Sequence, residues 1–208
     1  MKPLTDIIDD LCSWLDTNVC SRIQLLDPDD ENQDSTYQTK RIKPKVYPLF
    51  TPWADSSPET ILPGAPGIVV GMLEGIDDVI RQTRTLTIQL QLITFHPGLY
   101  GNDVLYVESD KTAPLGRRYY RKHDENQSYQ RSQEGWKDSY NFLSLCLAEL
   151  EKAEMISGMR IKLKDGQMNF GHYRDDTGPV DLWPYWINYI RFELEAGNRT
   201  ITSYEDKL

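Results

Sequence analysis

The chain lacks the features of a secreted, membrane-spanning or disulfide-stapled protein. Its cysteines are only three, Cys12, Cys20 and Cys146, an odd number without CxxC spacing. We therefore expect reduced, buried thiols of the kind found in cytosolic proteins. No apolar run follows Lys2, and nowhere do about 18 uncharged apolar residues follow one another. These absences predict neither a signal peptide nor a membrane span.

Positive charge is also scarce. Lys and Arg number 23 against 32 Asp and Glu, which gives a formal net charge of −9 and a pI of about 4.8. This balance argues against sequence-blind binding to a phosphate backbone. An acidic surface instead repels the phosphate backbone, so DNA can pass along it without binding. The length of 208 residues favours one domain, residues 1 to 208, with insertions.

Catalytic and cofactor motifs are missing as well. The sequence has no P-loop, dinucleotide fingerprint, GxSxG elbow, HExxH or EF-hand pattern. The three histidines, His96, His123 and His172, stand far apart without paired ligand spacing. Asp175-Asp176 is interpreted as part of a turn, and His172 as a hydrogen-bonded core residue. We expect no enzymatic activity, no cofactor and no metal.

The most regular stretch present is residues 85 to 94. Leu86, Ile88, Leu90 and Leu92 alternate there with Thr85, Thr87, Gln89 and Gln91. Alternation of this kind predicts a strand with one face in the core and one polar face. The neutral polar face suits solvent, as in ordinary half-buried strands, and it also suits contact with another protein surface.

Two amphipathic helices are expected, over residues 3 to 20 and about 136 to 156. The first carries an acidic face of Asp6, Asp9, Asp10 and Asp16, either solvated or facing a basic partner. The second has Cys146 in its apolar stripe and is expected to stop at Ser157-Gly158.

Further strands are expected on both sides of these elements. Residues 67 to 72 form a short apolar strand, and residues 74 to 84 a polar connection with a tight turn, which together suggest a β-hairpin with the 85 to 94 strand. Residues 159 to 173 predict a second hairpin around Asp165-Gly166. After a loop over residues 175 to 184, the last strand covers residues 185 to 195 and begins with apolar residues on both faces.

Two insertions interrupt this pattern, residues 27 to 66 and residues 98 to 135. The first has a polar part, expected to be mobile, and a proline-rich part that can form at best an edge strand. The second holds the one dense basic cluster: Arg117, Arg118, Tyr119, Tyr120, Arg121 and Lys122. Contact with an acidic surface of an adjacent subunit, a solvated loop and nucleic-acid binding all remain open for this cluster.

The order of these elements resembles the tail terminator, or tail completion, proteins of tailed bacteriophages and their defective-prophage relatives. The resemblance covers residues 1 to 20 and 67 to 195 without the 98 to 135 loop. It is carried by Ile68 to Met72, the strand to Phe95, Trp136 to Leu150, Phe170-Gly171-His172-Tyr173, and Leu182-Trp183-Pro184-Tyr185-Trp186-Ile187-Asn188-Tyr189 leading into Phe192-Glu193. Both insertions depart from a compact member of the family.

The resemblance implies an α+β subunit, with a mixed or antiparallel sheet of about four to five strands and two main helices packed on one face. Such subunits form a hexameric ring that caps the tail tube, ends its polymerisation and offers a surface to the neck or connector. The implied partners are further copies of the chain, the tube protein, the neck protein and, in a contractile tail, the sheath. DNA would pass through the ring without specific binding, and the protein would reside in the virion after assembly in the host cytoplasm.

Candidate contact residues follow from these expectations. They are Thr85, Thr87, Gln89, Gln91, Arg117, Arg118, Tyr119, Tyr120, Arg121, Lys122 and Tyr185. Three alternatives remain open: another neck protein of the head completion or stopper type, a nucleic-acid-binding domain that uses the basic cluster, and an uncharacterised hydrolase.

Overall fold

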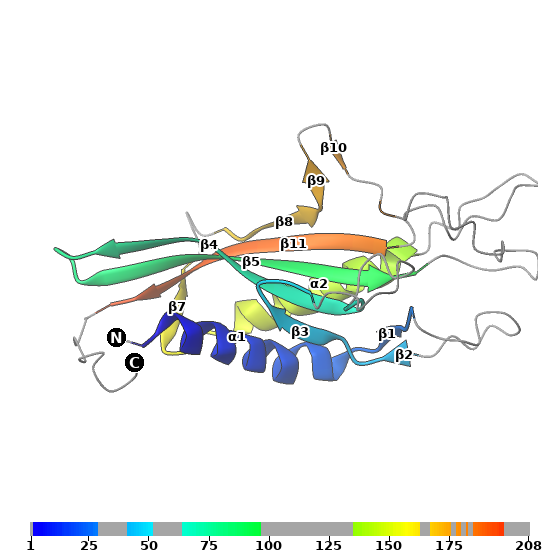
Figure 1. Cartoon of the computed structure of the whole chain (residues 1–208), viewed down its shortest axis with the longest axis horizontal. Coiled ribbons are helices and arrows are strands. Elements are labelled where there is room, and N and C mark those ends of the chain that lie inside the picture. Colours follow the sequence, from blue (N-terminus) through cyan, green and yellow to red (C-terminus); the bar gives the residue numbers. More distant parts are fainter. Residues whose placement is uncertain are drawn as a thin grey trace, which may run out of the picture.

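The fold is α+β, a curled mixed sheet of about six to seven strands with two helices (Figure 1). The computed structural model describes residues 2–28, 41–51, 64–96, 135–162, 167–175, 178–179, 182 and 185–197. The sheet is larger than the four to five strands expected from the sequence. Short edge strands account for the difference, because two to four residues of backbone pairing leave little periodicity to detect.

Two long strands form the centre of the sheet. β5 (Thr83–Phe95) and β11 (Tyr185–Ala196) pair antiparallel along their length, from Tyr185 opposite Phe95 to Ala196 opposite Arg84. The full order is β3 (Lys45–Pro48), β4 (Gly67–Asp78), β5, β11, β7 (Met159–Lys162) and β6 (Met155–Ile156), with β8 (Asn169–His172) also beside β11. β3 runs parallel to β4, and the other pairs are antiparallel. The predicted central strand is therefore confirmed.

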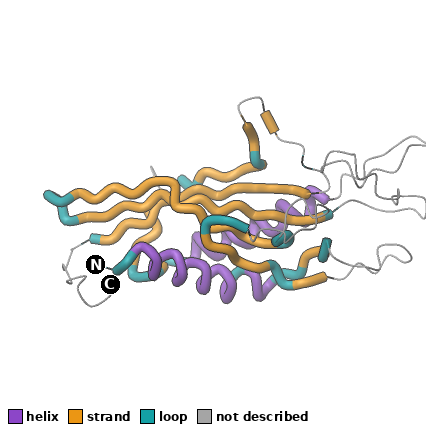
Figure 2. The backbone as a smooth tube through the Cα atoms, in the orientation of Figure 1, coloured by secondary structure: helices purple, strands orange, loops and turns teal. Residues whose placement is uncertain are grey.

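Both predicted helices are present, as α1 (Leu4–Asn18) and α2 (Gly135–Lys152) (Figure 2). A 3₁₀ turn, Cys20–Arg22, follows α1. Their apolar stripes share one core cluster with the inward residues of β5: Ile7, Leu11 and Leu15 from α1, Phe142, Leu143, Cys146 and Leu150 from α2, and Leu86, Ile88, Leu90 and Leu92. The phase assigned to each stripe and to the central strand is confirmed.

A second, smaller core cluster lies where β5 ends and β11 begins. It contains Leu26, Ala65, Val69, Ile93, Phe95, Tyr185 and Ile187. Since Ile190 and Phe192 belong to the main cluster, β11 is buried on both faces at its start and on one face further along. This agrees with the prediction made from its two apolar faces.

The predicted polar connection over residues 74 to 84 is wrong. β4 continues to Asp78, and the turn to β5 lies at Val79–Gln82, after a register shift between Met72 and Glu74. The polar residues resemble a loop because this part of the hairpin projects beyond the helices and has little core to face (Figure 1). The hairpin itself is confirmed.

The predicted end of the second helix is also wrong. α2 stops at Lys152, and Ser157-Gly158 instead joins the short strands β6 and β7. Both residues have positive φ, 56° and 73°, the conformation that a two-residue hairpin turn demands. The chain therefore makes a tight hairpin turn at Ser157-Gly158, before the Asp165-Gly166 pair at which a hairpin turn was predicted.

The predicted hairpin over residues 159 to 173 is not formed by its two arms. β7 pairs with Glu193–Glu195 and β8 pairs with Asn188–Arg191, so both arms follow the same edge of β11. The Asp165-Gly166 pair lies outside the described residues. Each arm pairs with the long, partly apolar edge of β11, because this edge buries more of the arm's side chains than the other arm would.

The remaining segments are short. β3 confirms that the proline-rich insertion reaches the sheet as an edge strand. β1 (Leu25–Leu26) pairs with β2 (Arg41–Ile42). β9 (Arg174–Asp175) pairs with β10 (Gly178–Pro179), where a loop over residues 175 to 184 was expected. Residues 29–40, 52–63 and 97–134 lie outside the description. Of the helices described, none has the length and apolar character to cross a bilayer.

Candidate interaction surface

The neutral row of β5, Thr85, Thr87, Gln89 and Gln91, lies on the sheet face opposite the main core. All four side chains are half-buried, whereas Leu86, Ile88 and Leu90 between them are buried. Residues in register share a face, so the row is flanked by β4 and β11. The flanking pairs are Val69 and Tyr189, Gly71 and Arg191, Glu74 and Glu193, and Ile76 and Glu195.

Two of the charged residues beside this row have polar contacts within the subunit. Arg191 Nη2 donates a 2.8 Å hydrogen bond to Gln89 Oε1. Lys162 Nζ lies 2.6 Å from Glu195 Oε2, and this hydrogen bond raises the pKa of Lys162. Because neutral amides and hydroxyls lose less hydration energy than free charges on contact, the face is suited to covering by another protein.

Two other sets of predicted contact residues stand apart from this row. Tyr185 is 2 % exposed, with its ring centroid 5.3 Å from that of Phe95. It therefore belongs to the smaller core cluster, which lies beyond the end of the row on the same face of the sheet. The basic cluster, residues 117 to 122, lies outside the described residues, so its predicted contacts stay predictions.

Two acidic residues of α1, Asp10 and Asp16, form ion pairs within the subunit. Asp10 pairs with Lys2 and accepts a 2.8 Å hydrogen bond from Ser157 Oγ, contacts that lower its pKa. Asp16 accepts a 2.6 Å bond from Lys43 Nζ. At least part of the acidic face is thus neutralised within the subunit, which weakens the case for a basic partner there.

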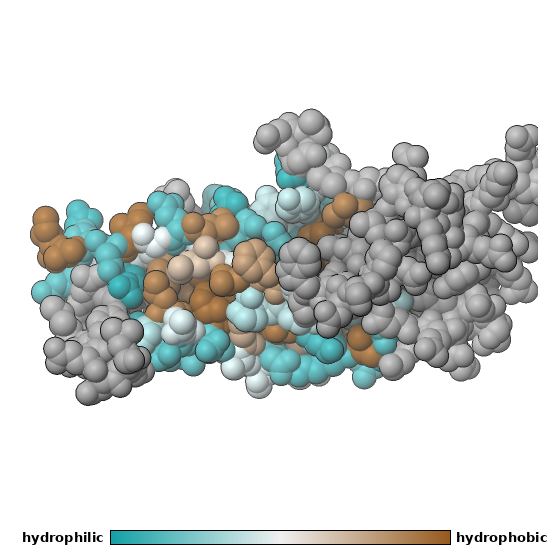
Figure 3. All heavy atoms as spheres, in the orientation of Figure 1, coloured by the Kyte–Doolittle hydropathy of each residue, from teal (hydrophilic) through white to brown (hydrophobic). Residues whose placement is uncertain are grey.

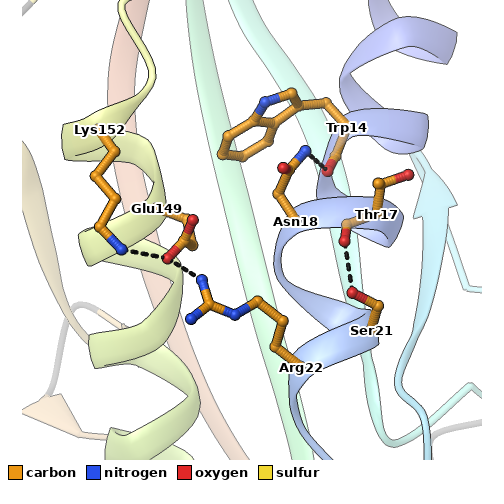
Figure 4. Close-up of polar contacts among 7 residues, drawn as sticks. All are labelled: Trp14, Thr17, Asn18, Ser21, Arg22, Glu149 and Lys152. Carbon is orange, nitrogen blue, oxygen red and sulfur yellow. Dashed lines mark hydrogen bonds and ion pairs between the residues drawn. The ribbon is translucent and has the colours of Figure 1, made fainter.

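A carboxylate on α2 links this helix to the 3₁₀ turn that follows α1 (Figure 4). Glu149 accepts hydrogen bonds from Lys152 Nζ, at 2.7 Å, and from Arg22 of the 3₁₀ turn. The bond from Lys152, with the added charge of Arg22, lowers the pKa of Glu149. Trp14 is half-buried against the main core, and its carbonyl accepts a 2.8 Å bond from Asn18 Nδ2. Glu149 therefore marks the side of α2 that faces α1.

One polar convergence was missed by sequence reasoning. His96 Nε2 and Arg41 Nη2 lie 3.8 and 3.6 Å from Asp138 Oδ2, and the three residues come from three segments. The His96 carbonyl also accepts a 3.0 Å hydrogen bond from Trp186 Nε1. An acidic residue in the first turn of a helix is favoured by the helix dipole, so the group anchors the start of α2. No local motif could have revealed it.

The hydroxyl of the next residue, Ser139, is hydrogen-bonded in the core. Ser139 is buried and accepts a 2.8 Å hydrogen bond from Asn188 Nδ2 in the core. Within the described ranges, no set of three or more His, Cys, Asp or Glu side chains is placed to hold a metal ion. His172 is half-buried on β8 in register with Asn188. Asp175 ends β9, which pairs with β10 in a separate two-stranded sheet.

These contacts and surfaces are the basis for assigning a function, because no protein-family model and no curated protein matches the chain.

Proposed function

We propose that this protein is a structural subunit of a phage-tail or tail-like particle, which forms a ring that caps the end of the tail tube. The observation that carries the proposal is the two-sided sheet. Both helices pack on the face formed by Leu86 to Leu92, and no described helix covers the row from Thr85 to Gln91 on the other face. A large sheet face with neutral, half-buried side chains is suited to an assembly contact.

Capping makes a specific physical demand on a subunit. It must bind the last ring of the tube and its own copies, and it must offer no surface that recruits another tube ring. A closed ring uses two unlike patches on every subunit, a heterologous contact whose rotation closes. The neutral row provides one candidate patch, and the basic cluster of residues 117 to 122 is proposed as another.

The proposed partners follow from this position in a particle. They are other copies of the chain in a hexameric ring, the tube protein, the neck or connector, and the sheath if the tail contracts. The net charge of −9 favours a ring through which DNA passes without binding. The protein would be assembled in the host cytoplasm and would remain in the virion.

Tube polymerisation in the presence of the purified chain tests this function. Light scattering coupled to size exclusion should give the mass of a ring, and electron microscopy should show shorter tubes that carry a cap at one end. Gln91→Arg, which places a charge in the neutral row, should weaken capping, while the exposed Ser13→Arg on α1 should not. A monomeric chain that leaves tube length unchanged contradicts the proposal. Binding to portal complexes instead of tube ends favours a stopper.

A further inference from the structure

The end of the sheet opposite the β4–β5 turn is where the second insertion, residues 97–134, leaves and rejoins the described fold. The turn carries exposed apolar side chains (Figure 3), whereas at the opposite end β5 finishes at Phe95 and α2 begins at Gly135 (Figure 1). A Cβ atom at Gly135 would lie 2.7 Å from the carbonyl oxygen of His96. The residue before the insertion and the residue after it are therefore in contact.

The indole of Trp186 fills the space beside this contact. Its Nε1 donates a 3.0 Å hydrogen bond to the His96 carbonyl, and the same nitrogen would lie 2.4 Å from a Cβ at position 135. Trp186 belongs to β11 and is in register with Thr94 of β5. Glycine is required at position 135 because any Cβ there would collide with the indole. We refer to His96, Gly135 and Trp186 as the insertion clamp.

Polar contacts support the clamp from the first turn of α2. Asp138 Oδ2 lies 3.8 Å from His96 Nε2 and 3.6 Å from Arg41 Nη2, so the end of β5 and the short strand β2 approach the same carboxylate. This oxygen is buried and has no hydrogen-bond partner among the described residues. Both distances exceed hydrogen-bonding range, and the indole of Trp186 therefore supplies the directional bond at this junction.

The clamp lies outside the hydrophobic core. Neither core cluster of the described residues includes a clamp residue, and the first residue of α2 in the main cluster is Phe142. A segment with few buried apolar contacts opens locally at a lower free energy than the core unfolds. The first turn of α2 can therefore separate from His96 while the sheet stays folded, and the clamp opposes this separation.

We infer that Trp186 is a positioning residue for the second insertion and that capping requires the clamp to be intact. The inference rests on the proposed function, which gives the basic cluster of residues 117 to 122 a contact in the ring. The clamp fixes both ends of the insertion at one point, so every subunit presents it from the same base. A ring repeats one contact around its axis and needs the same geometry in every copy. Loss of the clamp releases one end of the insertion and removes that common base.

The Trp186→Phe variant of the full-length chain tests the clamp, because it removes the indole N–H and keeps an aromatic ring. We expect amide hydrogen exchange over residues 135–145 to become about tenfold faster, the effect of one lost hydrogen bond, and tube capping to fall. Trp14→Phe is the matched control, since Trp14 is also half-buried but packs on the main core from α1. It should lower the urea midpoint and leave both exchange at the start of α2 and capping unchanged.

Gly135→Ala disrupts the clamp by a different route, because its methyl group displaces the indole. Gly197→Ala is its control, since a Cβ there meets no atom of the described residues within 4 Å. We expect Gly135→Ala to reproduce both effects of Trp186→Phe, and Gly197→Ala to behave like the wild type.

The outcomes separate the clamp from the ring. Unchanged exchange in Trp186→Phe overturns the clamp. Faster exchange with wild-type capping overturns the positioning role and leaves the ring in place. A wild-type chain that neither assembles nor caps tubes defeats the proposed function and the positioning role with it, whereas the exchange rates still decide whether the clamp exists.

Discussion

Asn188 Nδ2 donates a 2.8 Å hydrogen bond to Ser139 Oγ, and this bond joins β11 to the first turns of α2 inside the core. Both residues are buried, and the other amide atom, Asn188 Oδ1, is buried with no hydrogen-bond partner among the described residues. The pair therefore holds α2 in one position along β11 while it contributes little net stability. Hydrophobic contact alone would tolerate small shifts of the helix along the strand.

Ser139→Ala should destabilise the protein by about 1–3 kcal/mol, because it leaves the Asn188 amide without its partner in the core. Urea unfolding, followed by circular dichroism, measures this change. Ser144→Ala, at an exposed position of the same helix, is the control and should change the free energy of unfolding little. Equal stability of the two variants would show that the buried hydrogen bond is dispensable.

Leu90→Asp should prevent folding, whereas Gln91→Asp should be tolerated. Leu90 is fully buried in the main core, so an aspartate there would place an unpaired charge among aliphatic side chains. Gln91, the next residue, points to the half-buried polar face. Expression in the soluble fraction and a thermal melt distinguish the two. A soluble Leu90→Asp variant with a cooperative melt would overturn the assignment of faces along β5.

The free energy of unfolding should fall as the pH rises above about 9, in part because of the buried thiols. Burial raises the pKa of Cys20 to about 12, with a smaller contribution from Asp16, and that of Cys12 to about 11, from an ordinary value of 9.0. The unfolded thiols lose protons first, so the unfolded state binds fewer protons than the native state between about pH 9 and 12, and stability declines with pH there.

Urea unfolding between pH 8 and 10 measures this decline, with thiol titration as a second reading. Near pH 8 the native thiols should react much more slowly with a disulfide reagent than the same thiols in urea. Cys146, fully buried, should be the last to react, and half-buried Cys12 the first. Three thiols that react at once in the native protein would contradict the observed burial.

Charge reversal at Arg117, Arg118 and Arg121 to glutamate should weaken assembly and leave the fold intact. The expectation comes from the sequence, where these residues form the dense basic cluster of an acidic chain. Light scattering measures the assembly, and a thermal melt measures the fold. Conversion to glutamate of Lys45, Arg160 and Arg174, exposed basic residues outside the cluster, is the control with equal charge change. Normal assembly of the cluster variant would remove this loop from the subunit contact.

Local periodicity explains why the helices and the central strand could be predicted. The stripe from Ile7 to Leu15, and the alternation from Leu86 to Leu92, each place their apolar residues on one face whatever the rest of the chain does. The same reasoning identified the doubly buried start of β11. Periodicity did not predict the strand from Glu74 to Asp78. The backbone is paired there, but the side chains face no core, so apolar and polar residues need not alternate.

The candidate site was predicted only in part. The neutral row of β5 was assigned correctly to the face away from the main core, because the alternation assigns each side chain to a face. Tyr185 was named as a candidate contact residue, and in the structure it is buried, with its ring packed on Phe95 across the β5–β11 ladder. The exposed apolar residues at the β4–β5 turn, Val79 and Ile80, were missed because they were expected within a polar connection. The apolar pair Val79-Ile80, within a stretch predicted to be polar, was the sequence feature that could have revealed them.

The amino-acid sequence by itself determined the amphipathic helices, the two faces of β5 and the acidic charge, because each depends on residues a few positions apart. Only the tertiary structure decided which strands pair. β7 and β8 lie along β11 instead of along each other, and His96 meets Asp138 across 42 positions of sequence. In such contacts several distant segments could pair with the same strand edge or the same charge. The pairing with the lowest free energy depends on the whole fold, which local sequence does not contain.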